Sequence, residues 1–186
     1  MDPQTYIAPV RRWLETLVIG LNLCPFAKRE LARERVRFYV SEATTDEQLQ
    51  LDLEAELALL AEDEAIETTL LIHPHVLQDF FDYNQFLNHA DRVVAQLGYR
   101  GTFQVASFHP DYQFGGTEPD DVENTTNRSP YPLLHLIREA SLARAIAHYP
   151  DPDQIPARNI ARVEGLGADK MQALLDACFD TVHKSP

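Results

Sequence analysis

The stretch "TTLLIH", residues 68–73, decides the fold of this chain. It is a short apolar run of the kind found in strands at the centre of a sheet. Upstream of it, Thr45 opens a capping-box pattern that predicts a helix over residues 45–62. Downstream, residues 76–97 predict another helix, which ends where Gly98 can adopt a left-handed conformation. The run is therefore a strand with a helical connection on each side.

Two further segments have the pattern of strands. "VRFYVS", residues 36–41, alternates like a half-buried strand, and "TFQVASF", residues 102–108, follows the second helix. Helical connections between strands imply right-handed crossovers and parallel pairing. The sequence thus predicts an α/β fold with a small, mostly parallel sheet of three to four strands flanked by helices. An α+β, ferredoxin-like arrangement with an antiparallel strand is the alternative.

The remaining apolar patterns are helical. They predict an amphipathic helix over 3–22, a short helix beginning near Pro25, a strongly amphipathic helix over 131–148, and two final helices near 156–163 and 168–183. With 186 residues, the chain is long enough for one hydrophobic core. We therefore expect a single domain over 1–186, in which residues 152–186 form a helical C-terminal extension.

The charge balance limits the partners of the protein. The formal net charge is −13, and no Lys or Arg occurs in residues 42–67 or 111–123. Such a surface repels nucleic acid and anionic membranes, which bind proteins largely through basic residues, although it also simply keeps a protein soluble. No apolar run is long enough for a membrane span, no signal-peptide layout is present, and two cysteines are too few for a disulfide framework. We expect a cytoplasmic protein that binds neither nucleic acid nor membrane.

Histidines follow two of the predicted strands. His73 and His75 come directly after the second strand, and His109, Asp111 and Tyr112 come directly after the third. Ligands of open parallel sheets bind beyond the carboxyl ends of the strands. The sequence predicts that these side chains meet at one edge of the sheet, although a histidine at a strand end is often a purely structural group.

A connector of about twenty residues leads from the third strand to the helix expected over 131–148, and a loop of this length is often functional. Ser129 has the pattern of an N-cap, and the free N–H groups of the helix start, with Arg128, would bind an anion. On the same helix, His135 and Glu139 would share a face, with Arg138 beside them. Each of these groups also has an ordinary structural explanation.

Cys24 precedes a short helix that carries Lys28 and Arg29. The helix dipole and these cations would favour a thiolate, which would make Cys24 a nucleophile if it reaches the site. The alternative is that Cys24 packs as a small apolar residue. Cys178 lies in the apolar stripe of the last helix and is expected in the core.

The stretches "GLNLCPFAK", "SFHPDYQF" and "NRSPYPLLHLIREA" resemble the conserved motifs of a bacterial protein family of unknown function that has plastid relatives. The resemblance spans most of the chain and implies no reaction, cofactor or substrate. It implies only which positions deserve mutation first, namely Cys24, His109, Asn127, Arg128, Ser129, Tyr131, His135, Arg138 and Glu139.

These features favour a small-molecule enzyme that acts on an anionic metabolite bearing a phosphate or carboxylate. His109 and His135, with Glu139, would supply the acid/base chemistry and Cys24 a possible nucleophile. The anion would lie against a set of polar residues: Asn127, Arg128, Ser129, Tyr131, Arg138 and Tyr112. No Gly-rich phosphate loop follows a strand, so no nucleotide cofactor is indicated.

Three other functions stay open. A divalent metal could be held by His73, His75, His109 and Asp111, which are competent ligands without a diagnostic spacing. Residues 162–177 resemble a helix–hairpin–helix element, but the acidic protein lacks the basic residues of such DNA binders. The aromatic residues of "DFFDYNQF", 79–86, exceed what one helix face buries, which is compatible with a homo-oligomer or a non-catalytic binding protein.

Overall fold

The computed structural model describes residues 2–180 of the chain. The strands are β1 (Val36–Val40), β2 (Thr68–Ile72), β3 (Phe103–Phe108) and β4 (Leu133–Arg138). The α-helices are α1 (Gln4–Trp13), α2 (Ala27–Ala32), α3 (Asp46–Glu62), α4 (Phe80–Gln96), α5 (Glu139–Ala147), α6 (Ile155–Leu166) and α7 (Ala168–Asp176). A π-helix, η1 (Leu14–Ile19), continues α1, and three 3-10 turns are η2 (Val122–Asn127), η3 (Pro152–Gln154) and η4 (Ala177–Phe179).

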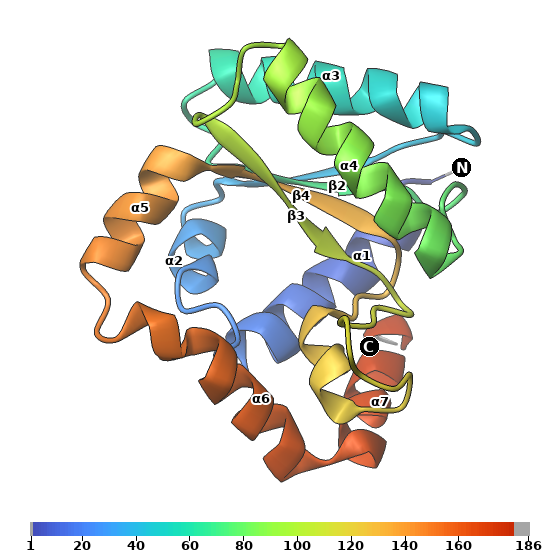
Figure 1. The fold of residues 1–186 in the computed structure, drawn as a ribbon, viewed down its shortest axis with the longest axis vertical. Helices are drawn as coiled ribbons and strands as arrows, with labels where there is room; N and C mark the ends of the chain where they lie inside the picture. Colours follow the sequence, from blue (N-terminus) through green and yellow to red (C-terminus); the bar gives the residue numbers. More distant parts are fainter. Residues whose placement is uncertain (1, 181–186) are drawn as a thin grey trace, which may run out of the picture.

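The four strands form one open sheet in the order β1-β2-β4-β3, with helices on both faces (Figure 1). β1 pairs with β2 in parallel, whereas β4 runs antiparallel to both β2 and β3. The predicted α/β class and strand number are confirmed, but the expectation of mostly parallel pairing is wrong. The element order also differs from the β-α-β-β-α-β order of a ferredoxin-like fold.

The error arose from β4. The sequence predicted a helix over 131–148, but residues 133–138 form the strand between β2 and β3, and only residues 139–147 are helical. Leu133, Leu134 and Leu136 are fully buried because helices cover both faces of this strand. A strand that is apolar on both sides has no period-two pattern, so hydrophobicity alone does not separate it from a buried helix.

The other elements follow the sequence closely. Thr45 caps α3 by accepting a hydrogen bond from the Gln48 N–H, and Gly98 after α4 has a φ of 79°, as the two patterns predicted. The last helix ends earlier than the predicted 168–183, since α7 stops at Asp176. Residues 181–183 of that prediction lie outside the described part of the chain.

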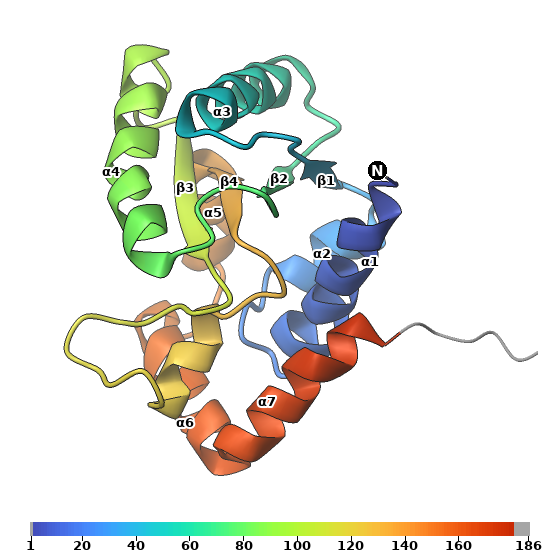
Figure 2. The ribbon, with the colours of Figure 1, turned by 90° about the vertical axis from the view of Figure 1, so that its right-hand side faces the viewer.

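Two apolar clusters hold the layers together. On one face, α3 and α4 pack against Leu71, Leu134 and Leu136. On the other, α1, η1, α6 and α7 pack against Leu70 and Leu133. Figure 2 shows α3 and α4 on one side of the sheet and α1, α2 and α7 on the other. Within residues 2–180, every helix is too short or too polar to cross a lipid bilayer.

Candidate functional site

The edge at which β1, β2 and β3 end is the place where the sequence predicted a site. β1, β2 and β3 run in the same direction, because β4 is antiparallel to both of its neighbours. His73 and His109 therefore lie at this edge, and both rings contact Tyr83, with centroid distances of 5.8 and 5.0 Å. Both histidines are fully buried, so the edge is packed core rather than an open cleft.

The ring nitrogens at this edge are mostly used by the fold. His109 Nδ1 accepts a hydrogen bond from the Asp111 N–H at 3.0 Å, which leaves Nε2–H to donate to the Leu77 carbonyl at 3.2 Å. His73 Nδ1 donates to the Val76 carbonyl at 3.0 Å, while its buried Nε2 has no partner among the described residues. Burial lowers the pKa of His73 to about 4 and also lowers that of His109. Both rings are neutral at pH 7, and the catalytic role of His109 gains no support.

The segment that follows Ser129 leads into the strand β4 and not into a helix, so the predicted anion site at a helix N-terminus is wrong. The Ser129 hydroxyl donates to the Tyr131 carbonyl at 2.7 Å instead of capping a helix. Arg128 donates to the carbonyls of Tyr112 and Pro119 at 3.3 and 2.6 Å. These hydrogen bonds join different parts of the long connector and stabilise its conformation.

Other predicted binding residues also pack within the fold. Asn127 donates to the Ser107 carbonyl at 3.1 Å, and Tyr131 packs edge-on against Tyr6 and Phe179. The Tyr112 ring lies 5.2 Å from that of Phe80. Their assignment to substrate binding remains a prediction without structural support.

The metal alternative is also unsupported by the geometry. No group of three or more His, Cys, Asp or Glu side chains between residues 2 and 180 is placed to hold a metal ion. His75, one of the candidate ligands, lies outside the buried pair and has its Nε2 3.2 Å from the Tyr6 hydroxyl. The four predicted ligands therefore do not form a common coordination sphere.

Three of the predicted residues do meet, in a cavity on the other half of the molecule. This cavity has a volume of about 280 Å³ and lies under the sheet, toward the edge where β1 and β2 begin. Its walls come from α1, η1, α2 and α5, and its roof from all four strands. The lining residues that bear polar groups are Cys24, Glu30, Glu67, Thr68, His135, Arg138 and Ser141. The rest of the lining is mainly apolar, with Trp13, Leu14 and Phe108 among it.

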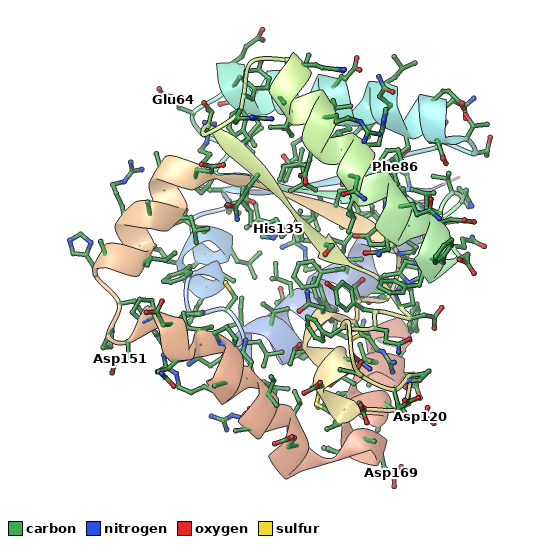
Figure 3. The ribbon with its side chains drawn as sticks, in the orientation of Figure 1. Glu64, Phe86, Asp120, His135, Asp151 and Asp169 are labelled. Carbon is green, nitrogen blue, oxygen red and sulfur yellow. The ribbon has the colours of Figure 1, made fainter. Side chains whose placement is uncertain are left out.

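His135 projects from β4 into this cavity and is near the centre of the molecule in Figure 3. Its Nε2 lies 2.7 Å from the Thr68 hydroxyl, whose oxygen is also 2.5 Å from the Leu136 carbonyl. A carbonyl only accepts, so the single hydroxyl proton of Thr68 goes to Leu136 and His135 Nε2 must donate. Nδ1 is then an acceptor, and no residue between 2 and 180 donates a hydrogen bond to it.

The environment keeps this imidazole neutral. Desolvation lowers the pKa of His135 to about 4, since no carboxylate is close enough to favour the charged ring. The ring is only half-buried by surface area because it borders the cavity. At neutral pH this ring therefore offers the cavity a lone pair and no charge.

Cys24 lies on the opposite wall, in the segment before α2. Burial raises the pKa of its thiol, and backbone hydrogen bonds from Phe26 and Ala27 offset this only in part. The expected stabilisation of a thiolate by Lys28 and Arg29 is thus wrong in direction. Cys24 is a neutral thiol at pH 7, whereas Cys178 is buried in the core as predicted.

Arg138 borders the cavity, but its charge is directed away from it. The guanidinium donates to the carbonyls of Leu60, Asp63 and Ile66 at the end of α3. It also lies 5.6 Å from the centre of the Phe103 ring. Arg138 therefore satisfies backbone carbonyls at and just after the C-terminal end of α3 and has a structural role there. Glu139 begins α5 with its N–H on the Thr102 carbonyl and is not part of the cavity wall.

The wall formed by η1 has an unusual backbone. Leu14 and Val18, both in the π-helix, line the cavity. The segment ends at Gly20, where a Cβ atom would lie 2.2 Å from the Thr16 carbonyl oxygen. Only glycine fits there, so the tight turn depends on it. Single π-helical turns are often found at functional sites.

Sequence reasoning missed several residues of this site. Thr68 and the two glutamates Glu30 and Glu67 carried no recognisable pattern, because their role depends on a strand that was assigned to a helix. Thr68 lies beside His135 only through the pairing of β2 with β4. Because the sequence pattern placed His135 and Glu139 on one face of a helix, it did not identify Thr68 as the neighbour of His135.

Comparisons with known proteins bear on the family and leave the activity open. A search of curated proteins and a search of solved structures both returned no match. A family profile matches residues 5–173, which cover most of the chain, including the cavity and the long connector. The protein therefore belongs to the family described as "Protein of unknown function (DUF1415)".

Proposed function

We propose that this protein is a small-molecule enzyme whose active site is the cavity between Cys24 and His135, with His135 as its acid/base group. The observation that carries the proposal is that no residue between 2 and 180 donates to Nδ1 of His135, whose ring lines an apolar cavity and is oriented by the Thr68 hydroxyl. A fixed base, an orienting partner and a space for the reacting atom are the elements that a catalytic site needs. The cavity is smaller than most drug-binding pockets, which favours a small substrate.

The chemistry is a proton transfer. Nδ1 accepts a proton from an acidic O–H, N–H or C–H group of the substrate, and the substrate keeps the electron pair. The resulting imidazolium still donates Nε2–H to Thr68, which passes its own hydrogen bond to the Leu136 carbonyl. A negative charge that develops on the substrate beside the ring raises the low pKa of His135 at the moment when the proton arrives.

Cys24 has a secondary role in this proposal. Its thiol is neutral, so it acts as a weak hydrogen-bond donor that faces the substrate from the opposite wall. Nucleophilic attack by Cys24 would first require a base to remove its proton. Among residues 2–180, the groups that affect the pKa of this thiol are backbone N–H groups, which are neutral donors and cannot remove the proton.

The wider expectations from composition are part of the same proposal. The net charge of −13 supports a cytoplasmic enzyme that does not bind nucleic acid. The exposed Phe81 of α4, 70% accessible, supports a contact with a second copy of the chain. Sedimentation at several protein concentrations tests the oligomer, and a gel-shift at low salt tests nucleic-acid binding.

The proposed activity is tested by incubating the purified protein with a mixed extract of small metabolites and following depletion by mass spectrometry. We expect the wild-type protein to deplete at least one compound and His135→Gln to leave it unchanged. Arg92→Gln, on an exposed position of α4 that does not line the cavity, is the control and should behave like wild type. If nothing is depleted, or if His135→Gln depletes the same compound, the enzyme proposal fails.

A further inference from the structure

The cavity adjoins a second hollow in the structure. This second hollow of about 530 Å³ lies between α2 and α5 and shares five lining residues with the cavity. The shared residues are Phe26, Glu30, Glu67, Ser141 and Ala145. Because these side chains line both spaces, the cavity and the second hollow are neighbours, separated only by the shared residues. The second hollow is the outer one, because Arg29 and Arg144, which line only this space, are exposed side chains.

A third hollow of about 510 Å³ continues in the same direction. It lies between α6 and the segment that precedes α2, and it shares Pro25 and Tyr149 with the second hollow. The contact between these elements is fixed by Asn159, which donates to the Leu23 carbonyl at 2.8 Å. The apolar cavity therefore adjoins the second hollow, and the second hollow adjoins the third. The elements that line them, α2, α5 and α6, can be followed in Figure 1.

The balance of charge differs along this path: Glu30, Glu67 and Arg138 line the mainly apolar inner cavity, whereas arginines outnumber carboxylates in the outer two hollows. The outer two hollows are lined by five arginines, which are Arg29, Arg35, Arg144, Arg158 and Arg162. Their only carboxylates are Glu30 and Glu67, and Arg35 binds both, at 3.2 and 2.6 Å. This concentration of positive charge stands out in a protein with 16 basic and 29 acidic residues. The average composition of the chain therefore does not explain why five arginines line these two hollows.

Three of these arginines, Arg144, Arg158 and Arg162, form no ion pair with any residue between 2 and 180. Arg158 donates instead to the backbone carbonyls of Gln154 and Asp151. Arg144 donates to the Ser141 hydroxyl at 2.9 Å, and Ser141 lines both the inner cavity and the second hollow. An exposed guanidinium therefore lies at the junction of the apolar and the cationic spaces. A guanidinium with free N–H groups binds a carboxylate or phosphate through two parallel hydrogen bonds.

We infer that the substrate is an amphiphilic anion. Its apolar body enters the inner cavity toward His135, and its carboxylate or phosphate head lies at the junction against Arg144 and Ser141. This inference rests on the proposed function, since it places the head relative to the cavity that contains His135. It also accounts for two features together, a mainly apolar inner space and an arginine-lined approach in an acidic protein.

The inner cavity contains its own reporter. Trp13 is the single tryptophan of the chain and lines the cavity, so ligands that enter it change the intrinsic fluorescence. Titrations with octanoate, octyl phosphate and 1-octanol compare two anionic heads with a neutral one on the same chain. We expect at least one anion to bind about tenfold more tightly than 1-octanol, and this preference to weaken as salt increases. The comparison of octanoate with octyl phosphate identifies the preferred head.

In the variant Arg144→Gln, the anion should bind about as tightly as 1-octanol, and the affinity for 1-octanol should stay unchanged. Arg92→Gln, on an exposed position of α4 in the opposite layer, is the matched control and should keep the preference. Binding of 1-octanol without any preference for an anion overturns the inference and leaves the cavity site standing, as does a preference that survives in Arg144→Gln. If no probe, including 1-octanol, changes the fluorescence, the cavity itself is not a binding site and the proposed function fails with it.

Discussion

Thr68 fixes the tautomer of His135 from the neighbouring strand. The hydroxyl lies 2.7 Å from Nε2 and gives its own proton to the Leu136 carbonyl, so Nε2 carries the ring proton and Nδ1 is the acceptor of a ring that lines the cavity. The relationship depends on β4 lying beside β2, where Thr68 and His135 are two residues out of register on adjacent strands. A threonine at the first position of a strand thereby becomes the orienting partner of a proposed base.

Replacing Thr68 by valine should release this tautomer. Valine has the same shape without the hydroxyl, so Nε2–H loses its acceptor and the free energy of unfolding falls by about 1–2 kcal/mol. In ¹⁵N-histidine NMR spectra, the His135 resonances should move toward a mixture of tautomers. Thr68→Ser keeps the hydroxyl and should retain the wild-type pattern. An unchanged spectrum in Thr68→Val would show that the hydroxyl does not orient the ring.

Acid should unfold the protein partly through its buried histidines. The pKa is about 4 in the folded protein for both His73 and His135, against 6.5 in an unfolded chain. The unfolded state therefore binds more protons between pH 6.5 and 4, and the free energy of unfolding falls as the pH drops through this window, by about 3 kcal/mol for each ring.

This pH dependence can be assigned to one residue. Urea denaturation at pH 7 and pH 4 should show a difference in unfolding free energy that is about 3 kcal/mol smaller in His135→Leu than in the wild-type protein. The comparison uses only the difference between the two pH values, so any general loss of stability in the variant cancels. An equal difference in both proteins would mean that His135 titrates normally.

Cys24 should react slowly with alkylating reagents. Its pKa is raised by burial, so the thiolate fraction at pH 7 is smaller than that of a free thiol. We expect iodoacetamide to modify it severalfold more slowly than glutathione, with the rate rising steeply above pH 8. Cys24→Ser reports the separate contribution of Cys178. A reaction faster than that of glutathione at pH 7 would restore Cys24 as a candidate nucleophile.

Arg138 should matter for stability rather than for ligand binding. Its guanidinium serves three carbonyls at the end of α3, and removing it leaves these acceptors in a partly buried place. Arg138→Met should lower the free energy of unfolding by about 2–3 kcal/mol in urea titrations. Arg92→Met, on an exposed position of α4, should change it little. Full stability of Arg138→Met would return the side chain to the group of possible ligand-binding residues.

The parts of the fold that sequence predicts well have a local physical cause. Thr45 caps α3 through its own side chain, and Gly98 adopts a positive φ, so both effects act within a few residues. β1, β2 and β3 are separated by helices of clear periodicity and were placed almost to the residue. The common direction of these three strands also follows, since each crossover returns the chain to the same end of the sheet.

The parts that sequence does not predict depend on distant pairing. Residues 133–138 have a helix-compatible pattern, and they form a strand because the gap between β2 and β3 supplies partners for their backbone. The error moved His135 from a sheet to a helix and paired it with Glu139 instead of Thr68. It also placed the expected site at the edge with His73 and His109, whereas the cavity lies toward the opposite edge.

The insertion of β4 between β2 and β3 has a consequence for how the chain is made. When residues 1–132 have left the ribosome, β1 and β2 can pair, but β3 has no neighbour to join, because β4 is its only partner among residues 2–180. The sheet closes in one step when residues 133–138 emerge, after a connector of more than twenty residues has already folded back. Until that moment β2 and β3 each expose an unpaired edge, and such an edge is a template on which another chain can pair.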